Sequence, residues 1–355
     1  MLRHAGIGTY IRNVVPRVVA RRPDWRFTFL ASRRALPDWT LNARALVRPC
    51  SSDIYTIAEQ VELPLKTPRS AALFWSPHYN VPVFSRAPLV VTVHDVCHLA
   101  MPDIYGGAAR GAYARYMFGT VRRRAREIVF DSDFTRSEFV RHVGEPARST
   151  TALLGVDHVW RAAIGSARPH PRPYVLFVGS GKPHKNLVAL IKAFEMSRMA
   201  LAGHDLVLLG SFQQRTIDDD ALGLANMLGA RVRLVHDADD ASVRAFVAGA
   251  AALVLPSLYE GFGLPALEAM AAGCPCLVSN VASLPEVCGD GALYCDPKDP
   301  ADIARQLVRL VSDGELRARL VSAGRLRADR FDWDVTAERT ASVLDRALGT
   351  GGGVA

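Results

Sequence analysis

The amino-acid sequence predicts an α/β protein built from two doubly wound parallel sheets. Its 355 residues exceed one ordinary hydrophobic core and fit two domains of about 100–200 residues each. Short β-branched or apolar runs alternate with longer helical patterns from end to end, which is typical of parallel strands covered by helices. A proline-bearing stretch at residues 161–173 interrupts this pattern, which then restarts. We therefore place the linker there.

The elements follow from the same patterns in chain order. In the first half we expect strands at Trp25–Leu30, Ala72–Ser76, Leu89–His94 and Ile128–Ser132, and a helix at Tyr105–Arg126. In the second half we expect strand Tyr174–Gly179, a helix from Asn186, strand Asp205–Gly210, a helix around Asp218–Leu228, strand Val232–His236, helix Ser242–Ala250 and strand Ala252–Pro256. Each unit of the second half is about 25–30 residues long, the size of one βα repeat.

These elements define two Rossmann-like domains with a cleft between them. We predict boundaries at residues 1–165 and 173–331, with a C-terminal helix at 332–348 that packs back on the first domain. In such a sheet a central strand normally leads into the first glycine turn, but Met1–Ala5 is too short and too polar to be that strand. The expectation is an upstream segment of about ten residues, rich in Val, Ile or Leu, that supplies it.

Composition excludes several classes of protein. Hydrophobic residues make up 49% of the chain and charged residues 22%, which excludes global disorder. The N-terminus has no apolar segment of a secretory signal, and no apolar run approaches the roughly 18 residues needed to span a bilayer. Six cysteines without a C-x-x-C pair are too sparse for a disulfide scaffold, so a reducing cytoplasm is expected.

The net charge of +8 is unevenly distributed. Residues 1–170 carry 24 Lys/Arg against 13 Asp/Glu, whereas residues 171–355 carry 19 against 22. A basic first half favours an anionic partner such as phosphate, a lipid surface or nucleic acid. A general preference for arginine, with 38 Arg against five Lys, is the alternative explanation for the Arg count.

Two motifs lie in the first half. Gly6-Ile7-Gly8 precedes an amphipathic pattern and predicts a glycine turn that opens a helix, where main-chain N–H groups can bind phosphate. The strand Val90–Val93 ends on His94 and Asp95, and a histidine there can donate to a sugar hydroxyl. His94, Asp95, Cys97 and His98 also resemble metal ligands, but no second ligand group stands out and a metal site is disfavoured.

The second half carries the stronger motifs. Gly179–Asn186 (GSGKPHKN) joins a strand to a helix, and its Lys182 and Lys185 suit a diphosphate at a helix N-terminus. In the segment 256–273, a strand ends, a glycine-rich turn follows and a helix begins near Leu264. Glu260 lies in the turn and Glu268 lies on the helix. Successive N–H groups from Gly261 to Leu264 predict an anion-binding turn, and both carboxylates can accept from sugar hydroxyls.

Together these motifs resemble glycosyltransferase family 4, the retaining GT-B glycosyltransferases. The resemblance rests on EGFGLPALE with its Glu-x7-Glu spacing, VGSGKPHKNL, the VTVHD strand end, FDSDFTRSEF and SLPEVCGDGALYCDP, which cover nearly the whole chain in the family's order. GIGTYIRNV, HDVCHLAMP and GKPHKNL look most like the bacterial mannosyltransferases that build surface polysaccharides.

The resemblance implies an acceptor-side first domain and a second domain that binds a nucleotide-diphospho-sugar, with GDP-mannose favoured and no separate cofactor. It implies that Lys185 holds the diphosphate, Glu268 the ribose and Glu260 the transferred hexose. His94 would approach the sugar from the first domain. The remaining donor-binding positions implied are main-chain groups of Gly8, Gly261, Phe262, Gly263 and Leu264.

Two departures from the family's pattern matter. Many members have an arginine five residues before the lysine, where this chain has Ser180, so Lys182 is expected to supply the second charge. The family also begins with a strand before the glycine loop, and only five residues precede Gly6 here.

We therefore expect hexose transfer, with mannose the best guess, from the donor to a glycan or polyprenyl-diphosphate-linked acceptor. The resemblance implies retention of configuration. No metal is expected, because no acidic D-x-D pair stands at a strand end. Arg122, Arg123, Arg124 and Arg126 would suit a lipid-diphosphate acceptor at an anionic membrane, so a cytoplasmic location with contact at the inner face of the cell membrane stays open. The alternative is a non-catalytic nucleotide-sugar or glycan-binding protein on the same scaffold. Nucleic-acid binding is not expected, because no stacking-aromatic signature appears.

Overall fold

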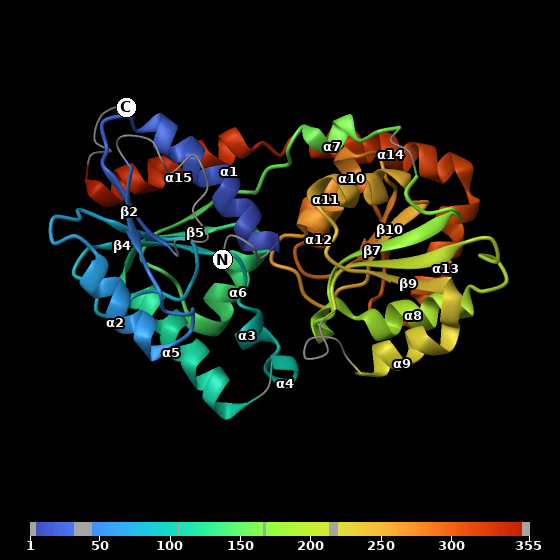
Figure 1. Ribbon diagram of the computed structural model, residues 1–355, viewed down its shortest axis with the longest axis horizontal. Helices are drawn as coiled ribbons and strands as arrows, with labels where there is room; N and C mark the ends of the chain where they lie inside the picture. Colours follow the sequence, from blue (N-terminus) through green and yellow to red (C-terminus); the bar gives the residue numbers. More distant parts are fainter. Residues whose placement is uncertain (1–4, 32–44, 106, 166–167, 213–218, 350–355) are drawn as a thin grey trace. The chain divides into compact units, whose positions relative to one another are not determined.

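The computed structural model describes residues 5–31, 45–105, 107–165, 168–212 and 219–349, and it divides into two compact units (Figure 1). Unit 1 comprises residues 1–155 and 332–355, and unit 2 comprises residues 156–331. Every strand pair in both units is parallel and the sheets are flanked by helices, which confirms the predicted α/β class.

In unit 1 the strands form a two-stranded sheet, β1-β2, and a four-stranded sheet in the order β3-β4-β5-β6. The strands are β1 (Phe27–Ala31), β2 (Ala45–Pro49), β3 (Phe74–Ser76), β4 (Leu89–Val93), β5 (Ala125–Phe130) and β6 (Ser149–Thr151). The helices are α1 (Ala5–Arg21), α2 (Ile57–Lys66), α3 (Cys97–Ala100), α4 (Pro102–Tyr105), α5 (Ala108–Arg124), α6 (Asp133–Val143) and α15 (Trp333–Leu348).

Strand β4 is the centre of this unit, because all five of its residues are buried. Helix α1 packs over it through Tyr10, whose hydroxyl lies 3.1 Å from Thr92 Oγ1. Trp75 Nε1 of β3 donates to the same threonine oxygen at 3.1 Å. The end of β4, which His94 directly follows, is therefore held by side chains from α1 and from β3.

One expectation for this unit is wrong. Gly6 and Gly8 lie inside α1, which begins at Ala5, and neither has a positive φ, so they form no turn ahead of the helix. The helix expected at Tyr105–Arg126 is confirmed as α5 with shorter bounds, because it begins at Ala108 after Gly107, which has a φ of 115°. The expected first strand would lie ahead of the described residues.

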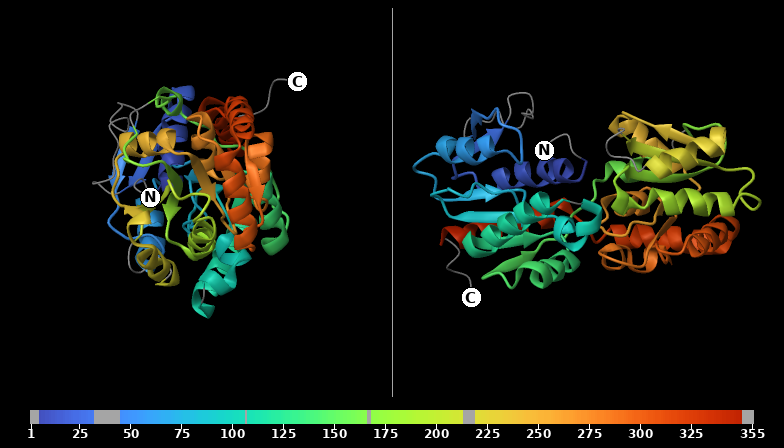
Figure 2. Two further views of the ribbon diagram at one scale, coloured as in Figure 1. Left: turned by 90° about the vertical axis from the view of Figure 1, so that its right-hand side faces the viewer. Right: turned by 90° about the horizontal axis from the view of Figure 1, so that it is seen from below.

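Helix α15 packs against α1 although more than 300 residues separate them (Figures 1 and 2). Arg21 of α1 forms ion pairs with Asp334 at 2.7 Å and with Glu338 at 3.1 Å, and Arg22 pairs with Asp345. Arg346 of α15 pairs in turn with the buried Glu127 of β5. Part of the basic surplus of the first half is thus used for structure within unit 1.

Unit 2 contains one six-stranded parallel sheet in the order β12-β11-β10-β7-β8-β9. The strands are β7 (Tyr174–Ser180), β8 (Asp205–Ser211), β9 (Val232–Val235), β10 (Ala252–Leu255), β11 (Cys276–Ser279) and β12 (Leu293–Cys295). The helices are α7 (Val159–Ala162), η3 (Pro183–Lys185), α8 (Leu187–Met196), α9 (Asp219–Leu228), η4 (Gly229–Arg231), α10 (Asp240–Gly249), α11 (Leu264–Ala271), α12 (Leu284–Cys288), η5 (Gly289–Gly291), α13 (Pro300–Ser312) and α14 (Gly314–Ala328).

The stretch expected to be the linker belongs to unit 2 instead. Residues 156–173 group with this unit, and helix α7 forms within them. His170 is buried, and its Nε2 lies 2.8 Å from Asp205 Oδ2 at the start of β8. This contact holds a proline-rich segment against the sheet, so the prolines do not mark the boundary between the units.

Gly155 provides a direct test of how α15 joins unit 1. A Cβ at this buried position would lie 2.1 Å from the Trp333 main-chain nitrogen, which real contacts do not allow. We predict that Gly155→Ala lowers the free energy of unfolding by about 1–3 kcal/mol, as overpacking does. Chemical denaturation measures this. Gly203→Ala is the control, because a Cβ there meets nothing within 4 Å. Equal stability of the two variants would contradict the packing described.

Candidate active site

The loop after β7 places Lys185 in unit 2. Lys182 precedes the short helix η3, and Pro183 at its first position fixes the chain direction. Asn186 then adopts a left-handed conformation with φ of 60°, and its Nδ2 donates to the carbonyls of Pro256 at 2.9 Å and Pro297 at 2.7 Å. Leu258 N donates to His184 O at 2.8 Å. These bonds tie the lysine loop to the segment that follows β10, the strand next to β7.

Lys185 and Glu260 form a direct, mostly buried ion pair. Lys185 Nζ lies 2.7 Å from Glu260 Oε1 and 2.8 Å from Oε2, and Glu260 is only 8% exposed. Ser257 Oγ also donates to Glu260 Oε1 at 2.8 Å. Each charge thus compensates the desolvation of the other at the carboxyl ends of neighbouring strands. From the family resemblance, Lys185 is expected to bind the diphosphate and Glu260 the hexose. Their direct contact with each other is not predicted from the sequence.

The glycine turn connects Glu260 to helix α11. Gly263 has a φ of 101°, and a Cβ there would also lie 2.7 Å from Leu284 Cδ2, so glycine is required twice over. Ser283 Oγ donates to the Glu260 carbonyl at 3.0 Å. Phe262 is buried, with its ring edge-to-face against Phe331 at 5.9 Å. Its side chain therefore anchors the turn, and only its main chain is available to a ligand.

Glu268 lies in the second turn of α11 with no hydrogen bond to its carboxylate among the described residues. Burial, followed by the nearby charge of Asp240, raises its pKa to about 8. The side chain as a whole is partly exposed, so the carboxyl group is desolvated yet open to a ligand. A desolvated carboxylate without a partner is an acceptor that a ligand hydroxyl can satisfy.

His94 lies in unit 1 and is held by two acceptors. Its Nδ1 is 2.5 Å from Asp131 Oδ2 at the end of β5, and its Nε2 is 2.9 Å from the Pro77 carbonyl oxygen. Burial acts to lower the pKa of His94, but the Asp131 charge and both hydrogen bonds outweigh it and raise the pKa. Burial raises the pKa of Asp131 as well. Both shifts favour a proton shared between the two side chains.

Asp131 is the residue that the sequence analysis missed. It was expected to lie inside a strand at Ile128–Ser132, but β5 ends at Phe130. The sequence does contain a signal for this contact, since Asp131 and His94 each lie at or next to the end of a predicted strand. Because β4 and β5 are neighbouring parallel strands, these two side chains lie side by side.

The predicted site residues thus fall into one group in each unit. Unit 1 holds Gly8, buried in the first turns of α1, and His94. Unit 2 holds Lys182, Lys185, Glu260, Gly261, Phe262, Gly263, Leu264 and Glu268. Lys182 is exposed, whereas Lys185 and Glu260 are brought into contact. Phe212, which follows β8, is buried with its ring centroid 5.7 Å from that of His236, and residues 213–216 lie outside the described part of the chain.

The possible metal ligands near His94 point to separate partners. Asp95 Oδ1 accepts from Cys97 N at 2.9 Å, and the His98 ring packs against Tyr105 at 4.8 Å. Within the described ranges, no three His, Cys, Asp or Glu side chains are grouped as metal ligands.

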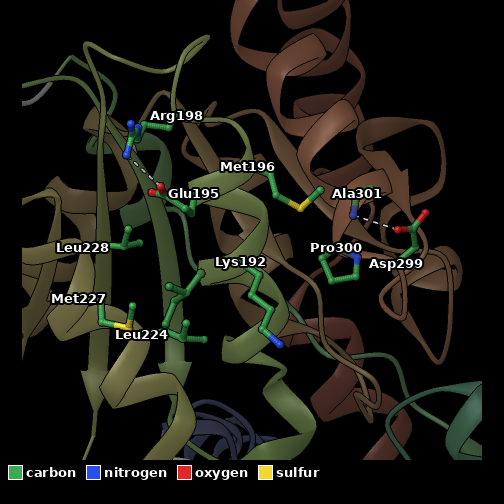
Figure 3. A pocket seen from close by; sticks show the side chains of 11 residues that line it. Lys192, Glu195, Met196, Arg198, Leu224, Met227, Leu228, Asp299, Pro300 and Ala301 are labelled. Carbon is green, nitrogen blue, oxygen red and sulfur yellow. Dashed lines mark hydrogen bonds and ion pairs between the residues drawn. The ribbon is translucent and has the colours of Figure 1, made fainter.

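A separate groove lies away from these residues in unit 2. Figure 3 shows its lining from α8, α9 and the start of α13, including Met196, Met227 and Pro300. None of the predicted site residues lines it. A search of the described helices found none with the length and hydropathy of a membrane span.

Comparisons with known proteins indicate the family and the fold of this chain. The profile of the family described as "Glycosyl transferases group 1" matches residues 161–327. The O-antigen chain mannosyltransferase B of Escherichia coli is 32% identical over 257 residues, which span 69% of this chain and 67% of that protein. Other matches include the glycogen synthase and phosphatidyl-myo-inositol mannosyltransferase of Mycobacterium tuberculosis, of whose lengths the chain spans 63% and 59%.

Solved structures match over nearly the whole chain. A sucrose-phosphate synthase from Thermosynechococcus elongatus has a TM-score of 0.78 at 20% identity and covers 97% of this chain and 94% of its own. Anabaena HepE in complex with UDP-glucose has a TM-score of 0.76 at 16% identity and covers 98% and 97%. At these identities the likeness concerns the fold. With the motifs, the parallel sheets and the mannosyltransferase relative in agreement, this chain belongs to the glycosyl transferases group 1 family, with the GT-B fold.

Proposed function

We propose that this protein transfers mannose from GDP-mannose to a glycan or a polyprenyl-diphosphate-linked saccharide, with retention of configuration. The observation that carries the proposal is the buried Lys185–Glu260 pair at the strand ends where ligands bind in such sheets. Glu268, whose carboxylate has no hydrogen bond among the described residues, lies on the helix that follows the same turn. Mannose is favoured because the O-antigen relative is a mannosyltransferase. Nothing observed favours the non-catalytic alternative, since both glutamates and the lysine are present.

In this proposal the Lys185–Glu260 pair opens when the donor binds. Lys185 turns its ammonium to the diphosphate and Glu260 accepts from hydroxyls of the hexose, so that each charge exchanges one partner for another. Glu268 accepts from the ribose hydroxyls. Lys182, exposed at the start of η3, adds a second positive charge for the phosphates.

The chemical step is the departure of the nucleoside diphosphate from an oxocarbenium-like sugar. The lysines and the start of α11 stabilise the negative charge that develops on the leaving phosphate. The pair of carboxylates that would act as nucleophile and acid in a glycosidase is not proposed, because in the donor complex Glu260 is engaged by the hexose hydroxyls and by Ser257 Oγ. We therefore favour attack of the acceptor from the face that the diphosphate leaves, with the departing phosphate accepting the acceptor's proton. His94 is proposed to donate to the sugar through Nε2, which would exchange the Pro77 carbonyl for a sugar hydroxyl while Asp131 keeps hold of Nδ1.

A donor panel tests the proposed function. We expect GDP-mannose to raise the melting temperature more than other nucleotide sugars and to be consumed when a lipid-linked saccharide is added. Proton NMR of the product should show the anomeric configuration of the donor. Transfer should persist in excess EDTA, because lysines rather than a metal ion compensate the diphosphate. Inversion, or loss of transfer in EDTA that magnesium restores, would contradict the proposal.

Lys185 and Glu260 are predicted to be essential. Lys185→Ala and Glu260→Gln should each lower the rate of transfer about 10²–10³-fold, because each removes a charged contact to the transition state. Steady-state transfer assays measure this, with the melting temperature as a check on folding. Lys192→Ala is the matched control, since Lys192 is exposed on the neighbouring helix α8. Activity of either site variant within threefold of the control would refute the assignment.

Glu268 gives donor binding a predicted pH dependence. Its pKa of about 8 means that much of it is protonated at pH 7, whereas an ionised carboxylate is the better acceptor. The donor dissociation constant should therefore fall about tenfold between pH 7 and pH 9. Glu268→Gln should weaken binding and remove this dependence, and Asp240→Asn should shift it to lower pH. Calorimetric titration across this range decides the matter.

The same shift predicts a change in stability with a definite sign. The folded chain keeps the Glu268 proton to higher pH than the unfolded chain, so the contribution is fully favourable below the ordinary carboxyl pKa and is lost as pH rises through about 8. Glu268→Gln should therefore raise the melting temperature at pH 9 more than at pH 5. An equal change at both values would contradict the raised pKa.

A further inference from the structure

Unit 1 contains a small pocket that none of the residues discussed so far explains. It has a volume of about 160 Å³ and lies between α3, α4 and the first turns of α5. Its lining comprises His98, Pro102, Tyr105, Gly107, Ala108, Arg110, Gly111 and Arg115. A liquid water molecule occupies about 30 Å³, so the pocket has room for a phosphate or diphosphate group.

The charged residues of the pocket lack compensating acids. Arg110 and Arg115 have no ion pair or hydrogen bond among the described residues. By contrast, Arg17 and Arg21 of α1, and Arg22 directly after it, are paired with acids of α15. No acidic residue lines the pocket. Two arginines without partners in one concavity make a site for an anion, because a guanidinium binds phosphate oxygens through two parallel N–H groups.

The local packing orients one of these arginines. The Arg115 guanidinium turns back over Gly111, where a Cβ would lie 3.6 Å from its NH1 nitrogen. A larger residue at 111 would fill the space that the guanidinium and the pocket share. On the opposite side, the His98 ring contacts Tyr105 edge-on at 4.8 Å and lies 6.1 Å from the buried Tyr79. The aromatic side chains of the lining are thus packed against one another, and the two arginines complete it from α5.

The pocket adjoins the predicted acceptor side. His98 belongs to α3, which follows His94 and the end of β4 within the same unit. We propose that this pocket binds a phosphate or diphosphate group, and that this group is the one that links the acceptor saccharide to its lipid. This inference rests on the proposed transferase function and narrows the acceptor to a phosphorylated one.

The experiment compares two acceptors that carry the same saccharide, one on a short isoprenyl diphosphate and one on an alkyl glycoside without phosphate. Arg115→Gln and Arg110→Gln should each lower the preference for the diphosphate acceptor, measured as the ratio of kcat/KM values, about tenfold. Arg69→Gln is the matched control, because Arg69 is an exposed arginine of the same unit that lies outside the pocket. An unchanged ratio, or an equal change in the control, would overturn the assignment to the acceptor.

Two further arms identify the source of the phosphate. Inorganic diphosphate, titrated in the presence of saturating GDP, should bind wild-type protein more tightly than the Arg115→Gln variant, and this readout does not depend on transfer. Selective loss of binding to phosphatidylglycerol vesicles in Arg115→Gln, with an unchanged acceptor ratio, would instead assign the pocket to a membrane headgroup. If wild-type protein transfers no sugar but still binds diphosphate at Arg115, the proposed function fails and the anion site stands. Equal diphosphate binding by wild type and variant refutes the site itself.

Discussion

The ion pair between Lys185 and Glu260 is the contact around which unit 2 is organised. Two loops that follow neighbouring parallel strands each deliver one charge, and Asn186 fixes their separation by donating to carbonyls on both the β10 and β12 sides. A buried carboxylate next to a ligand-binding edge would be costly alone. Because the lysine compensates it, the carboxylate can be buried at this edge of the sheet. Glu268 lacks such compensation, and its raised pKa is the consequence.

The fold and most of the site could be predicted from the sequence, because strand ends in parallel sheets carry readable motifs. The strands at 89–93, 174–180, 205–211 and 252–255 appear within a residue or two of their predicted positions. Failures came where tertiary contacts override local pattern. Gly6 and Gly8 suggested a turn but are helical, and the proline-rich stretch at 161–173 suggested a linker but is held by the His170–Asp205 contact. The Asp131–His94 contact depends on which strands are neighbours, which a linear pattern does not state.

The arginines of unit 1 include two groups that differ in their contacts. Arg17 and Arg21 of α1, and Arg22 after it, form ion pairs with acids of α15. These arginines hold the unit together, and their paired charges add little to the electrostatic potential outside it. In α5, Arg110 and Arg115 have no acidic partner among the described residues and line the same pocket. The net charge of the first half is therefore a poor guide to its partners. The arrangement of unpaired guanidinium groups is a better one.

The discontinuity of unit 1 has a consequence for the order of folding. Its last helix, α15, is synthesised only after all of unit 2, yet it supplies the acids that pair with α1 and the arginine that pairs with Glu127. During synthesis unit 2 is complete first, while the earlier-made unit must wait with an uncovered, positively charged helix face. That face stays without its acidic partners until α15 has been made. Unit 1, whose first segment is made before unit 2, is therefore completed after it.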